Sequence, residues 1–324
     1  MKIAHFSNEL LPVKYYGGVE RVVVWLLEAL QKMGHKNYLL APEGTASPFA
    51  EVIKVKKVKK IEVESPALQD KLPHDADVLH YHYGYSYLDY KLPTLKTIHG
   101  YAWLDKQLDD TFNFLSDAHR KAYKRPDLPF VHNGLKPEEY LYRENKEDFL
   151  LFLSRADWTV KGLPLAIEVA RRTGMKLIIA GNAHRKFVEG YAGFGYLKRH
   201  FNKQCLYVGE VTDEIKSAYL AKAKALIFPT QWEEPFGLVA IEAMVSGTPV
   251  ITTRHGAMPE VIVDKKTGFL CDGVEDMVNA VHRIQDISPT DCRRHVLDHF
   301  HYMRMAEDYI KLYIKRINDY TKHL

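Results

Sequence analysis

The sequence predicts an α/β fold of two Rossmann-like domains, each with a doubly wound parallel sheet between layers of helices. Short apolar stretches alternate with segments whose apolar residues recur at helical spacing, as in parallel strands joined by helices. Three expected helices end at a glycine shortly before the next strand, at Gly34, Gly174 and Gly247. The alternation starts again near Phe149, which indicates a second unit of the same kind.

Each half of the chain contributes its own set of elements. In the first half we expect strands at 2–7, 37–41 and 95–99, with a break at Pro12 and Gly17-Gly18 and a helix at 19–33. In the second half we expect strands at 149–154, 176–180, 225–229 and 249–252, and helices at 163–173 and 237–246. Such alternation is typical of parallel sheets that are buried on both faces.

The domain boundaries follow from composition. Residues 136–148 are polar and charged and contain Pro137, so we interpret them as a linker. The expected domains are therefore 1–138 and 139–303. Residues 304–324 form a further helix with one apolar face, made by Met305, Tyr309, Leu312, Tyr313 and Ile317.

Composition excludes several classes of protein. A net charge of +4 over 324 residues is too small to favour a nucleic-acid surface. The three cysteines are widely spaced, which argues against a zinc knuckle or a disulfide framework and favours a reducing compartment. The N-terminus has the pattern of a strand and not of a signal peptide, and the apolar runs are too short to span a bilayer. We therefore expect a cytoplasmic protein.

Residues 54–60 carry five lysines among valines. This pattern is typical of a solvated edge strand that lysines protect from pairing. It could also contact phospholipid or another anionic acceptor, so peripheral binding at the inner membrane face is an open alternative.

Gly17-Gly18 lies between the first strand and the first helix. Two glycines allow the backbone to approach a ligand closely, and the start of a helix offers free N–H groups for a phosphate or a hydroxylated acceptor. A tight turn is the alternative interpretation. The sequence contains neither a GxGxxG fingerprint nor a Walker A motif.

Arg155 follows the expected strand 149–154, and Lys161 comes immediately before the next helix. The carboxyl ends of parallel strands are where α/β sheets bind ligands. Two cations at this place can clamp a diphosphate and stabilise the charge on a leaving group. A pair of solvated surface cations is the alternative.

Residues 232–242 form the most specific motif, in which Glu234 and Glu242 are separated by seven residues. Gly237, Leu238 and Val239 would form the first turn of a helix, with N–H groups available to phosphate or sugar oxygens. A loop carboxylate can bind sugar hydroxyls or stabilise an oxocarbenium ion, and Glu242 could accept two ribose hydroxyls. The alternatives are an acid favoured by the helix dipole and a solvated helix glutamate.

His99 lies at the end of the expected strand 95–99, where it could bond a sugar hydroxyl or move a proton. A core histidine satisfied by backbone groups is the alternative. His80 and His82 share one face of a strand. We expect no metal there, because no acidic or cysteine partner is near in sequence.

Together these motifs resemble the retaining glycosyltransferases of family 4, which share the GT-B architecture of two Rossmann-like domains facing across a cleft. The likeness covers nearly the whole chain, and its most specific part is the EPFG block at 234–237 with Glu242. The other matching segments are 17–21, 97–100, 133–134, 154–155, 161–162, 180–181, 208–210, 243–244, 247–250, 259–261 and 267–269.

The resemblance implies a role for each candidate residue. Glu234 and His99 would lie at the transferred sugar as the catalytic residues, and Glu242 would bind the ribose. The donor diphosphate would lie against Gly17, Gly18, Arg155 and Lys161. The backbone of Phe236, Gly237, Leu238 and Val239 would meet the donor sugar and phosphate, and Gly209, Glu210 and Val211 would border the base.

The implied reaction is transfer of a hexose with retention from a nucleotide-diphosphate sugar, UDP-glucose first and GDP-mannose second. The acceptor would be a saccharide, a lipid-linked sugar or a small molecule, as in the biosynthesis of surface polysaccharide, lipopolysaccharide or glycolipid. The family implies no metal or other cofactor, because the two cations and the helix N-termini take its place. An epimerase or hydrolase of the same fold and a non-catalytic sugar-nucleotide-binding subunit are the alternatives.

The sequence departs from the family pattern in two places. Ala156-Asp157-Trp158 follow Arg155, where many relatives have leucine directly after the arginine, and the segment between His99 and Asn133 is short. Because the first domain shapes the acceptor pocket, the acceptor is not predicted. The helix at 304–324 is similar to the family's closing helix, which packs back on the first domain.

Overall fold

The computed structural model divides the chain into two compact units. The first is formed mainly by Met1–Val13, Gly17–Leu135 and His301–Leu324, and the second by Lys136–Phe300. The structure describes residues 1–13, 17–57, 66–82, 91–100, 108–182 and 203–322.

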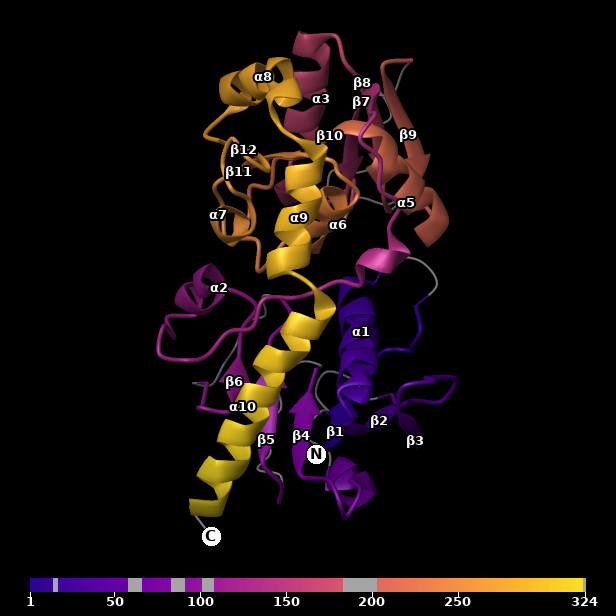
Figure 1. The fold of residues 1–324 in the computed structure, drawn as a ribbon, viewed down its shortest axis with the longest axis vertical. Coiled ribbons are helices and arrows are strands. Elements are labelled where there is room, and N and C mark those ends of the chain that lie inside the picture. Colours follow the sequence, from indigo (N-terminus) through magenta and orange to yellow (C-terminus); the bar gives the residue numbers. More distant parts are fainter. Residues whose placement is uncertain (14–16, 58–65, 83–90, 101–107, 183–202, 323–324) are drawn as a thin grey trace. The chain divides into compact units, whose positions relative to one another are not determined.

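The first unit contains a six-stranded sheet in the order β3-β2-β1-β4-β5-β6, in which each strand pairs in parallel with its neighbours (Figure 1). Its strands are β1 (Lys2–Phe6), β2 (Lys36–Pro42), β3 (Glu51–Val55), β4 (Val78–Tyr81), β5 (Thr94–Thr97) and β6 (Phe112–Asn113). Its helices are α1 (Gly18–Lys32), α2 (Asp117–Ala122) and α10 (Tyr302–Lys322), with a 3₁₀ turn at Pro66–Lys71.

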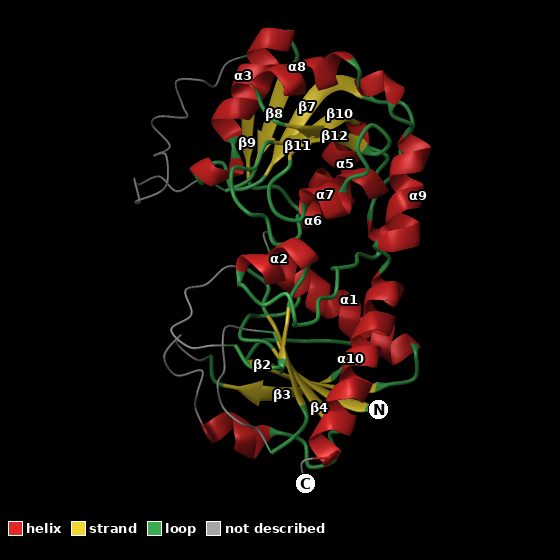
Figure 2. Ribbon diagram, turned by 90° about the vertical axis from the view of Figure 1, so that its left-hand side faces the viewer, coloured by secondary structure: helices red, strands yellow, loops and turns green. Residues whose placement is uncertain are grey.

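The second unit contains a six-stranded parallel sheet in the order β12-β11-β10-β7-β8-β9. Its strands are β7 (Glu147–Leu153), β8 (Lys176–Ala180), β9 (Cys205–Gly209), β10 (Ala223–Phe228), β11 (Val250–Thr253) and β12 (Gly268–Cys271). Its helices are α3 (Leu163–Thr173), α5 (Asp213–Lys222), α6 (Leu238–Val245), α7 (Met258–Val261), α8 (Val274–His282) and α9 (Pro289–His299). Helices α3 and α8 pack together on one face, and α6 packs against α5 and α9 on the other (Figure 2).

The predicted fold class is confirmed, because both sheets have the doubly wound Rossmann strand order. The strand order reverses between β1 and β4 in the first sheet and between β7 and β10 in the second. Loops that leave the carboxyl ends of these strands diverge, and the crevice between them is where such sheets bind ligands. Arg155 follows β7, Glu234 follows β10, and His82 follows β4.

The three glycines predicted to end helices have the left-handed backbone that this position favours. Their φ angles are 82° at Gly34, 71° at Gly174 and 78° at Gly247. This prediction is therefore confirmed.

The structure differs from the sequence predictions in two segments. Strand β5 ends at Thr97, so His99 lies in the loop beyond it. Residues 136–148, interpreted as a linker, pack within the second unit. Tyr140 is buried there, and Leu141 N–H donates a 2.8 Å hydrogen bond to Ser217 Oγ. The linker interpretation followed the many charged residues of this segment and did not account for Tyr140, which anchors it.

The chain returns to the first unit beside the place where it left. Leu135 and His301 form a parallel bridge, and Tyr302 N–H donates to the Leu135 carbonyl at 3.0 Å. Helix α10 then packs along α1 and over β5 (Figure 1). Lys32 Nζ donates to Tyr302 Oη at 2.8 Å. The C-terminal helix is thus part of the first unit.

The face of the first sheet beneath α10 carries buried polar groups. His80 Nδ1 lies 2.6 Å from Tyr313 Oη, and His80 Nε2 lies 2.7 Å from Thr97 Oγ1. Burial disfavours the charged imidazolium, so it lowers the pKa of His5 to about 3 and that of His99 to about 4. Burial also holds the pKa of His80 and of His82 well below the ordinary value of 6.5. These four imidazoles are therefore neutral at neutral pH.

Neutral buried histidines predict that the first unit loses stability in mild acid. Below pH 6.5 the unfolded chain binds protons at these residues, whereas the folded chain does not until about pH 4 or lower. The free energy of unfolding should therefore decrease as the pH is lowered through this window, by about 1 kcal/mol per pH unit for each histidine. Urea unfolding at several pH values measures the slope. His80→Gln keeps hydrogen-bonding groups without a titration and should reduce it, and an unchanged slope would contradict the assignment.

Substitution of Gly162 tests the close packing between the start of α3 and the end of β10. It caps the N-terminus of α3 with φ 80°, and a Cβ there would lie 1.9 Å from the Pro229 carbonyl oxygen. Gly174 caps the other end of α3 with φ 71° and open space around it. Gly174→Ala should cost about 1–2 kcal/mol for the left-handed backbone alone. Gly162→Ala should cost about 2 kcal/mol more because β10 must shift. Equal losses in urea unfolding would refute the close approach.

Candidate functional site

Two predicted site residues, Lys161 and Glu234, contact each other directly. Lys161 Nζ lies 2.6 Å from Glu234 Oε2, although the residues are 73 positions apart. Both side chains are largely buried, at 9% and 12% exposure. Lys161 ends a 3₁₀ turn (Thr159–Lys161) between β7 and α3, and Glu234 lies in the loop after β10. The reversal of strand order between β7 and β10 therefore brings these charges together.

Aromatic rings surround the Lys161 ammonium. Its Nζ lies 5.1 Å from the ring centroid of Trp158, 5.6 Å from that of Phe228 and 5.2 Å from that of Trp232. Such contacts favour a cation and exclude water. Neither Trp158 nor Trp232 was given a role from the sequence, although each lies within three residues of a predicted site residue.

Arg155 lies just after β7 and is half-buried. Its Nε lies 3.5 Å from Asp157 Oδ1, and the Asp157 side chain is 1% exposed. Asp157 belongs to the segment in which this chain departs from the family pattern. A buried carboxylate beside the guanidinium orients that group, so the departure adds a positioning residue to the predicted cation pair.

Glu242 is buried inside α6 and has two partners. Its Oε1 accepts a hydrogen bond from Tyr140 Oη at 2.7 Å and one from Lys216 Nζ at 2.8 Å. Glu242 is therefore not a solvated helix glutamate. Lys216 also lies 3.3 Å from Asp213 Oδ1. Sequence reasoning missed both Tyr140, which lies in the segment interpreted as a linker, and Lys216, which lies on α5.

The EPFG loop is fixed by the segment that follows β11. Ala257 N–H donates to the Glu234 carbonyl at 2.8 Å, and Gly256 N–H donates to Glu233 Oε2 at 2.9 Å. A Cβ on Gly256 would lie 2.2 Å from Glu234 N, so only glycine allows this approach. Gly237 caps α6 with φ 86° against the Met258 side chain.

The N-terminus of α6 lies next to the loop that carries Glu234. Gly237 precedes the helix, Leu238 and Val239 form its first turn, and Phe236 is buried beside it. The first N–H groups of a helix have no partner within the helix and point along the positive end of its dipole. Together with Lys161 and Arg155 they can bind an anion such as a phosphate.

The residues predicted to border a base lie at the end of β9. Gly209 has φ 77° and accepts a hydrogen bond from Gly181 N–H at 2.8 Å. Glu210 is exposed and Val211 is half-buried. They therefore lie at the carboxyl edge of the same sheet as Arg155 and Glu234.

Gly17, Gly18 and His99 belong to the first unit. Gly17 is buried and precedes α1, and its carbonyl accepts a hydrogen bond from Arg21 Nη1 at 3.2 Å. Gly18 is the first residue of the helix. The predicted entry from strand to helix is therefore present, and α1 presents its N-terminus to the end of β1.

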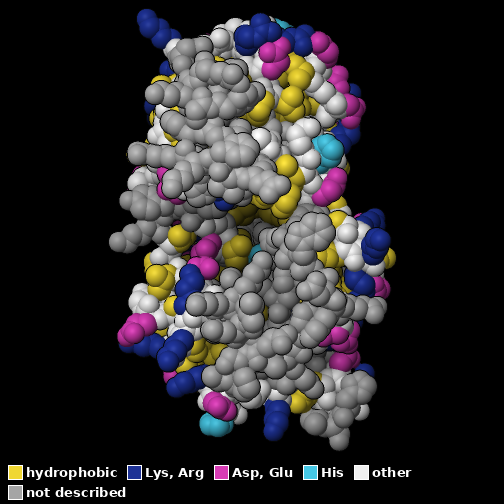
Figure 3. Space-filling view, turned by 180° about the vertical axis from the view of Figure 1, so that it is seen from behind, with side chains coloured by type: hydrophobic (Ala, Val, Ile, Leu, Met, Phe, Trp, Pro, Cys, Tyr) yellow, Lys and Arg dark blue, Asp and Glu magenta, His cyan; other side chains and the backbone are white. Residues whose placement is uncertain are grey.

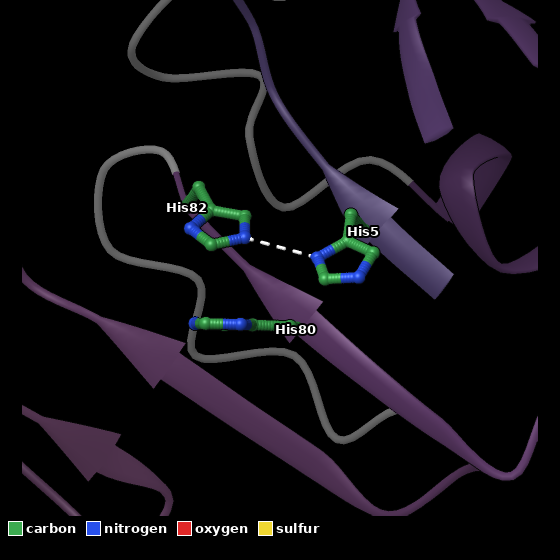
Figure 4. A group of neighbouring side chains, drawn as sticks. All are labelled: His5, His80 and His82. Carbon is green, nitrogen blue, oxygen red and sulfur yellow. Dashed lines mark hydrogen bonds between the residues drawn. The ribbon is translucent and has the colours of Figure 1, made fainter. Parts of the chain in front are cut away.

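His99 is half-buried and lies against a group of buried histidines. Its Nε2 lies 3.3 Å from His82 Nδ1, and His82 Nε2 lies 3.1 Å from His5 Nδ1. His5 and His82 point toward each other from neighbouring strands, with the ring of His80 close by (Figure 4). Sequence reasoning missed His5, because only the pairing of β1 with β4 places it beside His80 and His82.

Three of these histidines could be considered as metal ligands. One nitrogen from each of His5, His80 and His82 lies within 4.8 Å of the other two. Both nitrogens of His80 are engaged with hydroxyl groups of Thr97 and Tyr313. The expectation that the protein needs no metal stays a prediction.

The surface of the described residues carries mixed charges. On the face shown in Figure 3, Lys and Arg side chains lie among Asp and Glu side chains. Lys54, on the edge strand β3, is 70% exposed and lies 3.5 Å from Glu43, as expected for a protected edge. Residues 58–60 of the lysine run lie outside the described residues. Among the described helices, none is long and apolar enough to cross a membrane.

Comparison with known families gives two matches, one for each part of the chain. The family model described as "Glycosyltransferase Family 4" matches residues 16–133. The model described as "Glycosyl transferases group 1" matches residues 139–296.

Curated relatives match mostly over short segments. The aligned segments span between 18% and 38% of the first four relatives. The D-inositol 3-phosphate glycosyltransferase of Corynebacterium diphtheriae is 41% identical over 80 residues, which are 24% of this chain and 18% of the relative. The phosphatidyl-myo-inositol mannosyltransferase of Mycobacterium tuberculosis is 24% identical over 302 residues, 78% of each protein.

Solved structures match along almost the entire chain. AviGT4, a glycosyltransferase involved in avilamycin A biosynthesis, superimposes with a TM-score of 0.76 at 24% identity and covers 98% of both chains. Alr3699/HepE of Anabaena, in complex with UDP-glucose, superimposes with a TM-score of 0.71 at 14% identity and covers 100% of both. The strand order, the residues gathered at its reversal and the two family models lead to one conclusion: the chain belongs to the family 4 glycosyltransferases of the GT-B fold.

Proposed function

We propose that the chain transfers a hexose from a nucleotide-diphosphate sugar to a hydroxylated acceptor, with retention of the anomeric configuration. The observation that carries this proposal is the ion pair of Lys161 and Glu234, which lies between the first turn of α6 and the start of α3. This pair brings a cation and a carboxylate within one hydrogen bond of each other, an arrangement that would suit a phosphate next to a sugar.

The donor diphosphate would lie against Arg155, Lys161 and the first N–H groups of α6. Charge develops on the diphosphate as the glycosidic bond breaks, and fixed cations and helix dipoles stabilise that charge without rearranging. Asp157 holds Arg155, and three rings hold Lys161, so both cations are positioned before the donor binds. The proposal needs no metal ion.

Glu234 would act on the transferred sugar, and Glu242 on the ribose. Glu234 Oε2 accepts a hydrogen bond from Lys161 Nζ, and the carboxylate can bind hydroxyls or stabilise positive charge on the sugar ring. Glu242 Oε1 accepts from Tyr140 and Lys216, which leaves Oε2 to accept from the two ribose hydroxyls. Gly209, Glu210 and Val211 would border the base.

UDP-glucose is the first candidate donor and GDP-mannose the second. A solved structure of the same fold is described as a complex with UDP-glucose, and a relative over most of the chain is named as a mannosyltransferase. We further propose a cytoplasmic location with peripheral contact to an anionic membrane face through the lysines of residues 54–60. Sedimentation with anionic vesicles tests that contact.

A panel of nucleotide sugars tests the proposed reaction. The chain should release nucleotide with one hexose donor when acceptor mixtures are supplied, and NMR of the product should show the anomeric configuration of the donor. Glu234→Gln should reduce turnover by about 100-fold or more, in the range of lost charge stabilisation in other active sites. Glu233→Gln, at the exposed neighbouring position, is the matched control. Turnover with donor alone would favour an epimerase or hydrolase, and no binding of any nucleotide diphosphate would refute the proposal.

Glu242→Ala tests the ribose contact. Affinity for the nucleotide diphosphate should fall by about 1–3 kcal/mol if two hydrogen bonds are lost. The variant also removes the Glu242 carboxylate from buried Lys216, which keeps its contact with Asp213, so stability should fall. Glu242→Ala combined with Lys216→Met should recover stability but not affinity. Calorimetric titration and thermal unfolding separate the two effects, and unchanged affinity in a folded variant would exclude the ribose role.

A further inference from the structure

Glu242 belongs to a closed ring of contacts that joins three segments of the second unit. Tyr140 Oη and Lys216 Nζ both donate to Glu242 Oε1, at 2.7 Å and 2.8 Å. Leu141 N–H donates to Ser217 Oγ at 2.8 Å. Residues 140 and 141 are neighbours in the chain, as are residues 216 and 217 on α5, so these bonds close the ring. Each of the three segments is therefore held by the other two.

The polar groups of this ring are screened from solvent. Tyr140, Lys216, Ser217 and Glu242 are all buried. The Lys216 ammonium also lies 5.6 Å from the ring centroid of Tyr140 and 3.3 Å from Asp213 Oδ1. Hydrogen bonds in such surroundings are stronger than in water, and the loss of one partner leaves a buried polar group uncompensated. The ring therefore favours a single arrangement of its side chains.

Two donors on one oxygen fix the orientation of the Glu242 carboxylate. The last torsion of a glutamate is otherwise broad and roughly two-fold, so its two oxygens exchange easily. Each oxygen offers about two lone-pair sites, and Tyr140 and Lys216 use those of Oε1. A rotation that exchanged the oxygens would break both bonds. Oε2 makes no hydrogen bond to any residue that the structure describes, so it is the oxygen left for a ligand.

Glu242 also lies on the helix face that carries the start of α6. Leu238 and Glu242 are four residues apart, which places them on the same face, about 6 Å apart along the helix axis. Side chains on a helix tilt toward its N-terminus. A nucleoside diphosphate with its phosphates at the first turn of α6 would therefore extend its ribose toward Glu242.

We propose that Tyr140 and Lys216 are positioning residues that give the site its preference for a nucleotide with both ribose hydroxyls. They act through Glu242, by holding Oε2 where it accepts from the two hydroxyls. This role rests on the proposed function, which supplies the nucleotide. A nucleotide without these hydroxyls leaves a fixed acceptor without partners, and a site that orders its acceptor in advance rejects such a nucleotide more strongly.

A purely structural role makes a different prediction. In that case the ring would only fasten residues 136–148 to α5 and α6. Lys146 fastens the same elements at another place, because its Nζ donates to the carbonyls of Ala221 at 2.9 Å and Ser246 at 3.0 Å. Tyr142 is the matching tyrosine, whose hydroxyl contacts Glu144 and Thr290 at the exposed surface. These two residues provide controls for Lys216 and Tyr140.

Calorimetric titration of the full chain with UDP and with 2′,3′-dideoxy-UDP tests the proposal, with the GDP pair in place of these if guanine is the preferred base. The wild-type chain should bind the ribonucleotide about tenfold or more tightly. Tyr140→Phe removes one hydroxyl and should reduce this preference by about threefold to tenfold, with unchanged affinity for the dideoxy nucleotide. Tyr142→Phe should leave the preference unchanged. Equal weakening of both nucleotides by Tyr140→Phe, or an unaltered preference, would overturn the proposal.

Lys216→Met and Lys146→Met separate positioning from stability. Both variants lose a buried ammonium, so both should unfold at lower urea concentration. Only Lys216→Met should lose preference for the ribonucleotide. The same loss of preference in both variants would show that it follows stability and would contradict the assignment. If Lys216→Met does not fold, Tyr140→Phe still decides, because it keeps the ring of the side chain and the ion pair of Lys216.

A double variant tests whether Tyr140 acts through Glu242. Tyr140→Phe combined with Glu242→Ala should bind UDP no more weakly than Glu242→Ala alone, because the hydroxyl then has no carboxylate to hold. Additive losses would exclude this route. With an active donor, Tyr140→Phe should raise KM by about threefold to tenfold and leave kcat unchanged, since the ribose is remote from the bond that breaks. A loss confined to kcat would overturn the assignment.

Two further outcomes distinguish this inference from the proposed function. Nucleotide binding by the wild-type chain without preference for the ribose hydroxyls would overturn the inference and leave the proposed function standing. If the wild-type chain binds no nucleotide diphosphate, the proposed function fails, and the preference fails with it.

Discussion

The reversal of strand order in the second sheet is the constraint on which the candidate site depends. Parallel strands send their following loops to one edge, and at β7 and β10 those loops turn to opposite sides. Lys161 and Glu234 reach each other at this edge, and Gly162 lets the start of α3 approach Pro229 at the end of β10. Gly256 then brings the loop after β11 against Glu234. These contacts all lie at the edge where the strand order reverses, so the site is a consequence of how the sheet is wound.

The buried charges at this edge are paired before any ligand binds. Lys161 pairs with Glu234, Arg155 lies beside Asp157, and Glu242 accepts from Lys216 and Tyr140. Unpaired charges in such surroundings would be strongly destabilising. Pairing also positions each group, because a side chain held by a partner has little freedom left to lose when a donor binds. Stability and preorganisation therefore come from the same contacts.

The sequence predicted where the site residues lie along the chain, but not which groups hold them. Position after a strand was enough to select Arg155 and Lys161, and spacing selected Glu234 and Glu242. Their partners lie far away in sequence: Tyr140 is 102 residues from Glu242, and His5 is 77 residues from His82. Such contacts depend on strand order and register, which local periodicity does not encode. The burial of Tyr140 was hidden for a related reason, since the average composition of residues 136–148 concealed one anchoring side chain.

The central strands of the two sheets differ in their buried side chains. Both sheets have the same strand order, yet β7 is filled with Leu150, Leu151 and Phe152, whereas β1 and β4 carry His5 and His80. Apolar residues would stabilise the first sheet more simply, because each buried imidazole must find partners to offset its desolvation. The histidines find them in Thr97, Tyr313 and one another. Since α10 supplies Tyr313, the C-terminal helix and the carboxyl edge of the first sheet are joined through His80 and Thr97. The polar core therefore connects the closing helix to the strand that leads to His99.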